Sequence, residues 1–208
     1  MKTLRVALIA GALAALSAPT LVAQVELEVT PFAGGTVFLA DPPNQFQLGR
    51  TQGSPLTVQG GSFDDAWTLG VNAGVRFAET WAVEGMFSWI PTSLNARSGL
   101  LGKEDINGYM YGVTLLYYVP VDWPVTPFLG LGVGGETFDY DTPGLKTENE
   151  YMGNVVGGLF LPVTDVFGVR FEARDCFARF DSGIATVDDA WENDLMLSVG
   201  FSFRTAIR

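Results

Sequence analysis

The residues of this sequence that could do chemistry are charged side chains repeated at every second position. Arg170, Glu172 and Arg174 follow with a period of two, so in an extended strand all three point to the same side. Four more charged residues occupy even-numbered positions of similar stretches: Glu26, Glu28, Arg76 and Glu84. These charges nearly cancel, which predicts a network of buried ion pairs, since one charge left unpaired inside a protein costs several kcal/mol. The alternative is a gate, in which the pairs exchange partners to open a narrow path.

The turn after Phe77 allows a first estimate of which charges meet. If this short turn pairs Phe77 with Trp81, then Gly74 lies opposite Glu84 and Arg76 lies diagonal to Glu84. Long side chains reach across such a diagonal, so Arg76 lies within reach of Glu84. Arg76 also lies beside the start of the first stretch, which carries Glu26 and Glu28.

Enzymatic chemistry is not expected, because the chain contains no histidine. The usual general base near neutral pH and the Ser–His arrangement are therefore both missing. Glu84 and Glu172 could in principle act as a carboxylate pair, but they are better explained as ion-pair partners. The single Cys176 has no second cysteine to bridge, so we interpret it as a small filler on the inner face.

Two further patterns could suggest a ligand, and neither has the required context. Gly130 to Gly135 matches the G-x-G-x-x-G fingerprint, but that fingerprint needs a helix to follow, and the residues from Glu136 read as a strand end and a loop. The pairs Asp139-x-Asp141 and Asp188-Asp189 offer hard oxygen ligands without the spacing of an EF-hand. We predict no cofactor and no metal, and interpret these acids as solvated.

Strands must position the charged residues, because apolar residues alternate with polar or small ones in eight stretches. On the odd-numbered face there is no charge, while the even-numbered face carries the charged residues together with many glycines and Ser, Thr or Asn. A period of two is the signature of a β-strand with two different faces. The stretches lie at about residues 25–39, 67–77, 81–89, 107–119, 125–137, 151–161, 166–176 and 192–203.

The period alone allows two kinds of barrel, a soluble one with the apolar face inside or a membrane barrel with it outside. The connections favour the membrane barrel, because brief turns alternate with long polar connections at about 40–66, 90–106, 138–150 and 177–191. The acidic excess lies mainly in these long connections. The sequence therefore predicts an all-β protein, an eight-stranded antiparallel up-and-down transmembrane β-barrel with both termini on the periplasmic side.

Aromatic residues gather at both ends of the apolar face, as expected where rings meet the two membrane–water interfaces. Beside the long connections lie Trp67, Trp89, Tyr109 and Tyr151. At the short-turn rim lie Phe77, Trp81, Tyr117, Trp123, Phe167 and Phe203. We interpret these two sets as aromatic girdles.

The first residues predict export. Residues 1–23 combine a positive start, an apolar run and a terminal Leu-Val-Ala, which is the layout of a secretory signal peptide. No later apolar segment is as long as the roughly 20 residues of a membrane helix, although the mean hydropathy is +0.23. A net charge of −11 argues against nucleic acid as a partner. We therefore expect a barrel domain at residues 24–208 in the outer membrane.

Parts of the chain resemble a known family. The segments Val29–Phe38 and Pro127–Phe138 look like strands of small outer-membrane β-barrel proteins, the group similar to the OmpA transmembrane domain. The run Leu195-x-Leu-x-Val-x-Phe-x-Phe203 is similar to the last strand of that family. The resemblance implies outer-membrane lipid, lipopolysaccharide and the barrel-assembly machinery as partners in a Gram-negative envelope. It also leads us to expect a barrel without the periplasmic domain of longer relatives.

The leading functional hypothesis is a structural outer-membrane protein, with a filled polar lumen and acidic loops, that contributes to envelope integrity. One alternative is a narrow, porin-like channel for small solutes or hydrophobic molecules. Another is an adhesion or interaction protein acting through the connection at 40–66, whose aromatic residues are Phe46 and Phe63. The sequence does not distinguish among ligands, nor does it define an oligomeric state.

Overall fold

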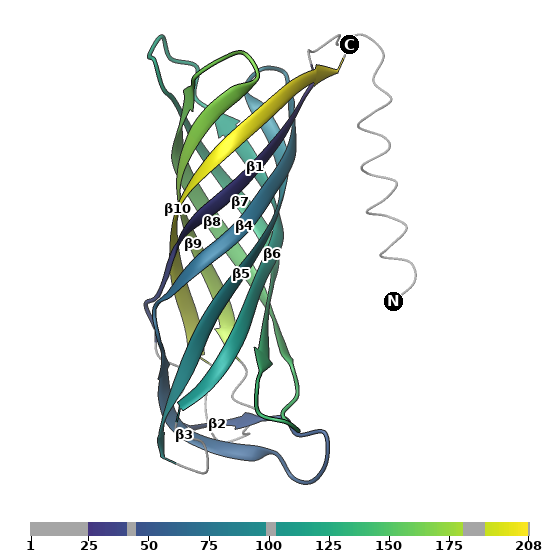
Figure 1. Cartoon of the computed structure of the whole chain (residues 1–208), viewed down its shortest axis with the longest axis vertical. Helices are drawn as coiled ribbons and strands as arrows, with labels where there is room; N and C mark the ends of the chain where they lie inside the picture. The colour runs from purple at the N-terminus through teal and green to yellow at the C-terminus, as the bar shows by residue number, and fades with distance from the viewer. Residues whose placement is uncertain (1–24, 41–44, 99–102, 181–189, 208) are drawn as a thin grey trace.

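A computed structural model describes residues 25–40, 45–98, 103–180 and 190–207 (Figure 1). The predicted signal peptide at residues 1–23 lies outside these ranges. Within them no helix has the length and apolar character needed to cross a membrane. The strands are β1 (Val25–Phe38), β2 (Gln45–Leu48), β3 (Leu56–Phe63), β4 (Ala66–Phe77), β5 (Trp81–Ser98), β6 (Lys103–Tyr118), β7 (Thr126–Tyr140), β8 (Glu148–Pro162), β9 (Phe167–Phe180) and β10 (Ala190–Ile207).

Eight of the strands close into one antiparallel barrel. Their order around the barrel is β1, β4, β5, β6, β7, β8, β9, β10 and back to β1. Closure matters because it leaves no open sheet edge, so the backbone groups of the wall are paired within the protein. The predicted eight-stranded up-and-down barrel is confirmed. The strands are inclined to the long axis (Figure 1), and the two described chain ends, Val25 and Ile207, pair at one end of it.

Even-numbered side chains point into the barrel and odd-numbered ones point out. On β9, for example, Arg170 is 1% exposed while the neighbouring Phe171 is 46% exposed. The outward apolar segments, such as Trp67–Phe77 on β4, match the roughly 9–11 residues that a tilted strand needs to cross a bilayer. The wall therefore presents an apolar band outside and encloses the charged residues.

The strands extend farther at one end than the sequence predicts. The end with the short turns and the two termini is here called the turn end, and the opposite end the loop end. At the loop end β5 continues past residue 89 to Ser98, and pairs with β6 as far as Asn95 and Lys103. The predicted long connections were therefore too long, because beyond the apolar band outward residues meet water. There the backbone ladder continues after the hydrophobic period is lost.

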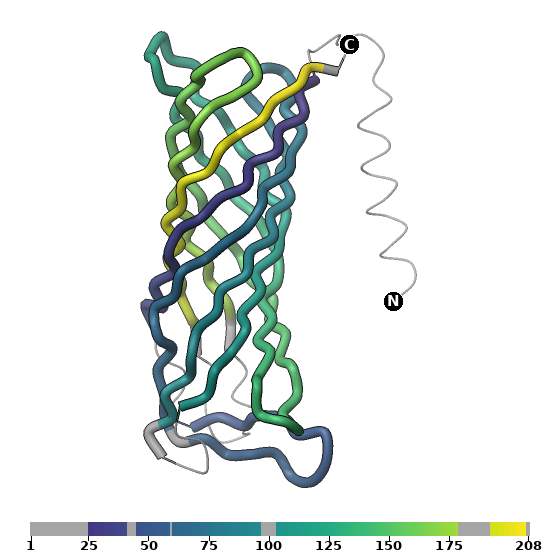
Figure 2. The backbone as a smooth tube through the Cα atoms, viewed as in Figure 1, coloured from purple at the N-terminus to yellow at the C-terminus, as the bar shows by residue number. Residues whose placement is uncertain are grey.

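The predicted polar connection at 40–66 is also wrong in part, since it contains the hairpin of β2 and β3. β3 pairs with the extension of β5, where Phe63 lies opposite Leu94. The hairpin crosses the loop end of the barrel (Figure 2) and reaches the connection between β7 and β8. There the Lys146 backbone N–H donates to the Gly49 carbonyl at 2.9 Å. We call β2 and β3 the cap.

The underside of the cap is apolar. Phe46 is 1% exposed and Phe63 is 9% exposed, so neither aromatic ring is offered to a partner in solution. Both rings belong to a buried cluster that joins the cap to the barrel strands. Its buried members are Phe46, Leu48, Val58, Phe63, Leu94, Ile106, Phe138 and Tyr140.

Candidate functional site in the barrel lumen

Two arginines of β9 occupy the centre of the candidate site. Arg170 and Arg174 are 1% and 0% exposed, which makes them the largest fully buried side chains among the described residues. Their even positions on a strand of period two direct both guanidinium groups into the lumen. Glu172 lies between them on the same face and is 6% exposed. The local sequence of β9 thus builds half of the site.

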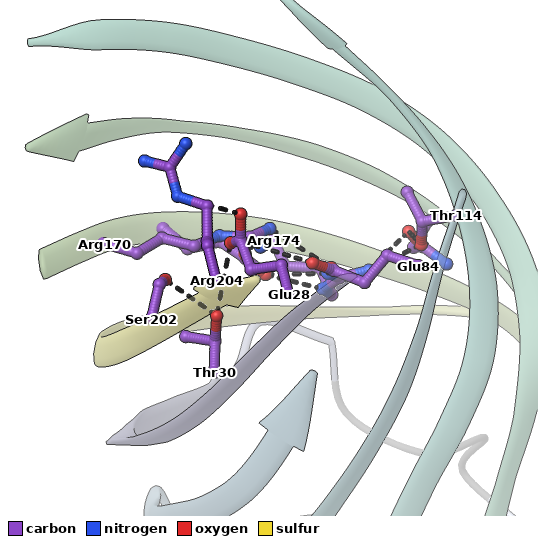
Figure 3. A network of polar contacts seen from close by, with 10 residues as sticks. Glu28, Thr30, Glu84, Thr114, Arg170, Arg174, Ser202 and Arg204 are labelled. Atoms are coloured by element: carbon purple, nitrogen blue, oxygen red, sulfur yellow. Dashed lines mark hydrogen bonds and ion pairs between the residues drawn. The ribbon is translucent and has the colours of Figure 1, made fainter. Parts of the chain in front are cut away.

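Acidic residues from other strands complete the network (Figure 3). Glu84 of β5 accepts a hydrogen bond from Arg170 Nη2 at 3.1 Å and also contacts Arg170 Nη1. Its Oε1 lies 3.5 Å from Arg174 Nη2. On β1, Glu28 Oε1 lies 3.7 Å from Arg170 Nη1. Three strands that are far apart in sequence therefore meet at Arg170.

Glu172 bridges the two arginines from within β9. Its Oε2 lies 2.6 Å from Arg170 Nη2, and its Oε1 lies 2.7 Å from Arg174 Nη2. Arg174 Nη1 donates to Thr114 Oγ1 and to Asn154 Oδ1, both at 2.9 Å. Such multiple, charge-assisted hydrogen bonds are what makes a buried guanidinium tolerable.

A second group of charges lies nearer the turn end. Arg76 Nη1 and Arg204 Nη1 each lie 3.9 Å from Glu26 Oε2, and Arg204 Nε lies 3.7 Å from Glu28 Oε2. Of the acids that the sequence places near Arg76, Glu26 is the one it contacts, and the predicted register of Gly74 with Glu84 is present. Arg76 lies directly opposite Glu26 in the pairing of β4 with β1, which brings it closer to Glu26.

Arg204 is the network residue that sequence reasoning missed. It was placed after the last strand, because the apolar alternation ends at Phe203. β10 in fact continues to Ile207, and Arg204 lies opposite Glu28 in the pairing with β1. Its even position, matching the lumen face of the same strand, was the available signal. The ion-pair network of the described residues thus comprises Glu26, Glu28, Arg76, Glu84, Arg170, Glu172, Arg174 and Arg204.

Aromatic rings close the lumen at the turn end. The Cζ atoms of Arg76, Arg170 and Arg204 lie 3.6, 4.4 and 3.7 Å from the ring centroids of Tyr118, Phe128 and Phe160, respectively. These distances are those of cation–π contacts, which add to the ion pairs in a desolvated site. The rings belong to a buried cluster of Ala82, Leu116, Tyr118, Phe128, Val156 and Phe160. Charge and aromatic surface therefore fill this end together.

The half of the lumen toward the loop end is apolar in part, which the expectation of small and polar inner residues did not include. Met86, Met110, Met152 and Met196 are each 5% exposed or less and belong to one buried cluster, which we call the methionine layer. Cys176, 2% exposed, packs in the same cluster. Flexible thioether side chains fill irregular interiors well, which accounts for their use in a narrow lumen.

Three carboxyl groups lie between the methionine layer and the cap. They are Glu136 of β7 and Glu192 and Asp194 of β10, and we call them the acidic layer. The exposed fractions of these residues are 1%, 4% and 5%. The sequence places Glu192 and Asp194 at the start of the stretch 192–203, and the structure buries both side chains.

The aromatic residues of the two predicted girdles lie at the two ends of the barrel. Trp67 and Trp89 stack edge to face at the loop end with ring centroids 5.0 Å apart. At the turn end Trp81 and Tyr117 are 4.9 Å apart. Exposure varies among the others, from 93% for Tyr151 to half-buried rings. The remaining girdle residues all point outward or lie in a turn: Phe77, Tyr109, Trp123, Phe167 and Phe203.

The described residues of the lumen form ion pairs and packed clusters. Among the described residues no group of three or more Cys, Asp or Glu side chains is arranged to hold a metal ion. Each described nucleophile in the lumen also lacks a neighbouring imidazole, because the chain has no histidine. What the arrangement does provide is charge neutralisation across the barrel.

Comparison with known proteins agrees with this architecture. Residues 8–203 match the family described as outer membrane protein beta-barrel domain. The chain belongs to this family. The outer membrane protein beta-barrel domain agrees with the closed wall and the apolar outer band, and it places the protein in the outer membrane.

Individual relatives of this outer-membrane barrel are distant. Outer membrane protein Omp38 of Acinetobacter baumannii is 27% identical over 181 residues, covering 84% of the chain and 48% of the relative. The chain thus spans about half the length of this relative. Two solved structures share the fold. The outer membrane protein OprG of Pseudomonas aeruginosa has a TM-score of 0.59 and 17% sequence identity, over 89% of this chain and 97% of OprG. Neisserial surface protein A has a TM-score of 0.53 and 16% sequence identity, over 85% of this chain and 96% of that protein.

Proposed function

We propose that the protein is a structural component of the outer membrane, a closed barrel that contributes to envelope integrity and bears acidic loops. The observation that carries the proposal is the burial of Arg170, whose guanidinium contacts Glu28, Glu84 and Glu172 at once. A solute crossing the lumen would have to separate these pairs. Breaking a buried pair costs about 3–5 kcal/mol, and several are joined here.

The layers on either side of the network support the same proposal. Aromatic rings lie on the turn-end side, and the methionine layer and the cap lie on the other. Eight-stranded interiors are about wide enough for side chains to fill. Outer-membrane lipid surrounds the apolar band, and we propose lipopolysaccharide beside the loops and the barrel-assembly machinery as the partners of this role. We further propose that the protein is not an enzyme.

The decisive experiment measures conductance of the purified protein in planar bilayers, with an Arg170→Met variant and a Phe171→Leu variant as the matched outward control. We expect no conductance steps from the wild type or from Phe171→Leu. Steps from the Arg170→Met variant alone would support the network as the seal. Regular steps from the wild type would overturn the closed barrel.

The envelope role needs its own measurement in the native host. Deletion of the coding sequence should increase vesicle shedding and sensitivity to detergent, and the Phe171→Leu variant should restore both. Unchanged vesicle release and detergent resistance on deletion would contradict this part of the proposal.

One observation favours a gated narrow channel as the second candidate. Glu84 and Glu172 each contact both Arg170 and Arg174, so alternative pairings already exist within the network. Exchange between such pairings could open a path without leaving a charge alone. Rare wild-type conductance steps whose frequency changes in Glu84→Gln would favour this candidate. Adhesion through the cap has weaker support, because Phe46 and Phe63 are buried.

A further inference from the structure

The acidic layer is a place where burial and charge conflict. On the lumen face of β7, Glu136 lies two residues before Phe138, a member of the cluster under the cap. On β10, Glu192 and Asp194 directly precede Met196 on the lumen face. The three carboxyl groups thus lie between two apolar clusters, under the cap and above the methionine layer.

No described cation neutralises these carboxyl groups. None of the ion pairs among the described residues includes Glu136, Glu192 or Asp194, and the charged groups nearest Glu136 are acidic. Glu136 Oε1 and Glu192 Oε1 are buried without a hydrogen-bond partner. The other titratable groups on the surrounding strands are Glu104 of β6, Tyr140 of β7, Glu148 and Glu150 of β8, and Arg174, Asp175 and Cys176 of β9. Arg174, the described cation among them, is engaged by Glu172 and Glu84.

Burial decides whether the carboxyl groups of the acidic layer are protonated or ionised. A carboxylate in an apolar site without a cation is strongly disfavoured, whereas a protonated carboxyl is tolerated. Adjacent carboxylates also repel one another, so the layer loses its protons in steps. Full ionisation requires water or cations to enter the space between the cap and the methionine layer.

The cap is the wall that can yield. The barrel strands on every side are held by continuous ladders of antiparallel pairs, including the closing pair of β1 with β10. The cap is held by the short pairing of β3 with β5, by the buried apolar cluster that it shares with the barrel strands and by contacts near Gly144 and Lys146. Local opening follows the segments with the fewest backbone bonds.

We propose that the acidic layer is a pH-sensitive switch for the cap. With the carboxyl groups protonated the cap is closed on the loop end, and their ionisation drives water into the layer and lifts the cap. This inference rests on the closed lumen of the proposed function and adds a condition under which the loop-end half becomes accessible. The ion-pair network below remains intact, so the barrel wall and its seal do not change.

Cys176 provides a native probe of the switch. It is the one cysteine of the chain, is 2% exposed, and lies opposite Asp194 in the pairing of β9 with β10. We would measure the rate at which a membrane-impermeant methanethiosulfonate modifies Cys176 in the whole protein, in vesicles, from pH 5.5 to 9.5. Each rate is divided by that of an exposed reference cysteine, Ser54→Cys in a Cys176→Ser background, which corrects for the ionisation of an accessible thiol. The triple variant described next controls for the ionisation of Cys176 itself.

We expect the normalised rate of the wild type to rise by about tenfold or more across this range, as the open population grows. A triple variant, Glu136→Gln with Glu192→Gln and Asp194→Asn, should remain slow at every pH because its layer stays neutral. An equal rise in the triple variant, or a flat wild-type rate, would overturn the proposal.

A disulfide across the closed cap gives a second test that does not alter the acidic layer. A Cβ placed on Gly49 lies 3.4 Å from Lys146 Cβ, close to the separation of about 3.5–4.5 Å in disulfides. In Gly49→Cys with Lys146→Cys, oxidation should abolish the pH-dependent modification of Cys176, read on its own peptide by mass spectrometry, and reduction should restore it. Modification that persists in the oxidised form would show that the cap is not what opens.

The two proposals fail in different ways. Bilayer conductance at low pH, where the cap is closed, would contradict the closed barrel and leave the Cys176 rates to decide the switch. Flat Cys176 rates would contradict the switch and leave a silent bilayer as support for the closed barrel.

Discussion

Arg170 binds Glu84 across the lumen, although 86 positions separate the two residues in sequence. One residue stands on β9 and the other on β5, so the contact joins opposite parts of the wall. Because both side chains are almost fully buried, each depends on the other for its charge to be tolerated.

Replacing Arg170 with Met should lower the free energy of unfolding by about 3–5 kcal/mol, since Glu84 and Glu172 lose a cation in a dry interior. Adding Glu84→Gln to this variant should restore part of the loss, because one uncompensated charge is removed. Urea titrations of folding in lipid vesicles measure both. Equal stability of the single variant and the wild type would contradict the importance of this pair.

Gly34 and Gly35 should respond differently to the same change. A Cβ on Gly34 would lie 2.0 Å from the backbone oxygen of Leu197, whereas one on Gly35 would meet nothing nearer than 3.7 Å. The Gly34→Ala variant should therefore fold poorly and lose most of its heat-modifiable gel mobility, while Gly35→Ala should match the wild type. Equal folding of both variants would show that β1 and β10 can separate to make room.

The turn between β4 and β5 should gain stability from glycine at one position. Glu79 has a φ of 64°, in the left-handed region that costs residues other than glycine about 1–2 kcal/mol. Glu79→Gly should raise the free energy of unfolding by roughly 0.5–1 kcal/mol, after the greater flexibility of glycine in the unfolded chain is subtracted. Thr80→Gly, next to it and outside that region, is the control and should be destabilising. A lower midpoint of thermal unfolding for Glu79→Gly than for Thr80→Gly would contradict the strain at Glu79.

The Asp64–Lys103 contact at the base of the cap should titrate at low pH. Lys103 Nζ donates to Asp64 Oδ2 at 2.9 Å, and this bond lowers the pKa of Asp64 below its ordinary value against the opposing effect of burial; Asn95 lowers it further. The contribution to cap stability is therefore fully present above the ordinary pKa of an aspartate and is lost as the pH falls through the lowered value.

Carboxyl ¹³C shifts from nuclear magnetic resonance follow this titration directly. In Lys103→Met the midpoint of Asp64 should move upward toward that of a free aspartate. Because both side chains are partly exposed, the effect on global stability should be small. An unchanged midpoint would mean that the contact does not persist in solution.

The sequence predicted the faces of the barrel well, because a period of two is a local property. Successive side chains of a strand point to opposite faces, so Arg170, Glu172 and Arg174 point into the lumen and Phe171 points outward. The partners of each charge were harder to predict, since they depend on how the register accumulates around eight strands. The sequence places Arg76 near both Glu84 and Glu26, and only the structure shows that it contacts Glu26, its direct neighbour on β1.

The loop end was predicted least well. Phe46 and Phe63 lie in a polar connection with no clear period, and only the fold reveals that they meet Phe138 under the cap. Glu192 and Asp194 begin the last predicted stretch, next to an acidic connection, and the sequence does not show that they come together with Glu136 in the lumen. Contacts of this kind join segments distant in sequence, and a local pattern carries no information about them.

The ion-pair network also bears on how the wall is completed. Glu28 stands on the first strand, Glu84 in the middle of the chain and Arg170 near its end, so no partly assembled sheet can bring all three together. In a barrel left open between β1 and β10, Arg170 would lack its contact with Glu28 of β1. Folding intermediates that lack the pairing of β1 with β10 are therefore less stable than the closed barrel, and the last strand pairing completes the set of buried ion pairs.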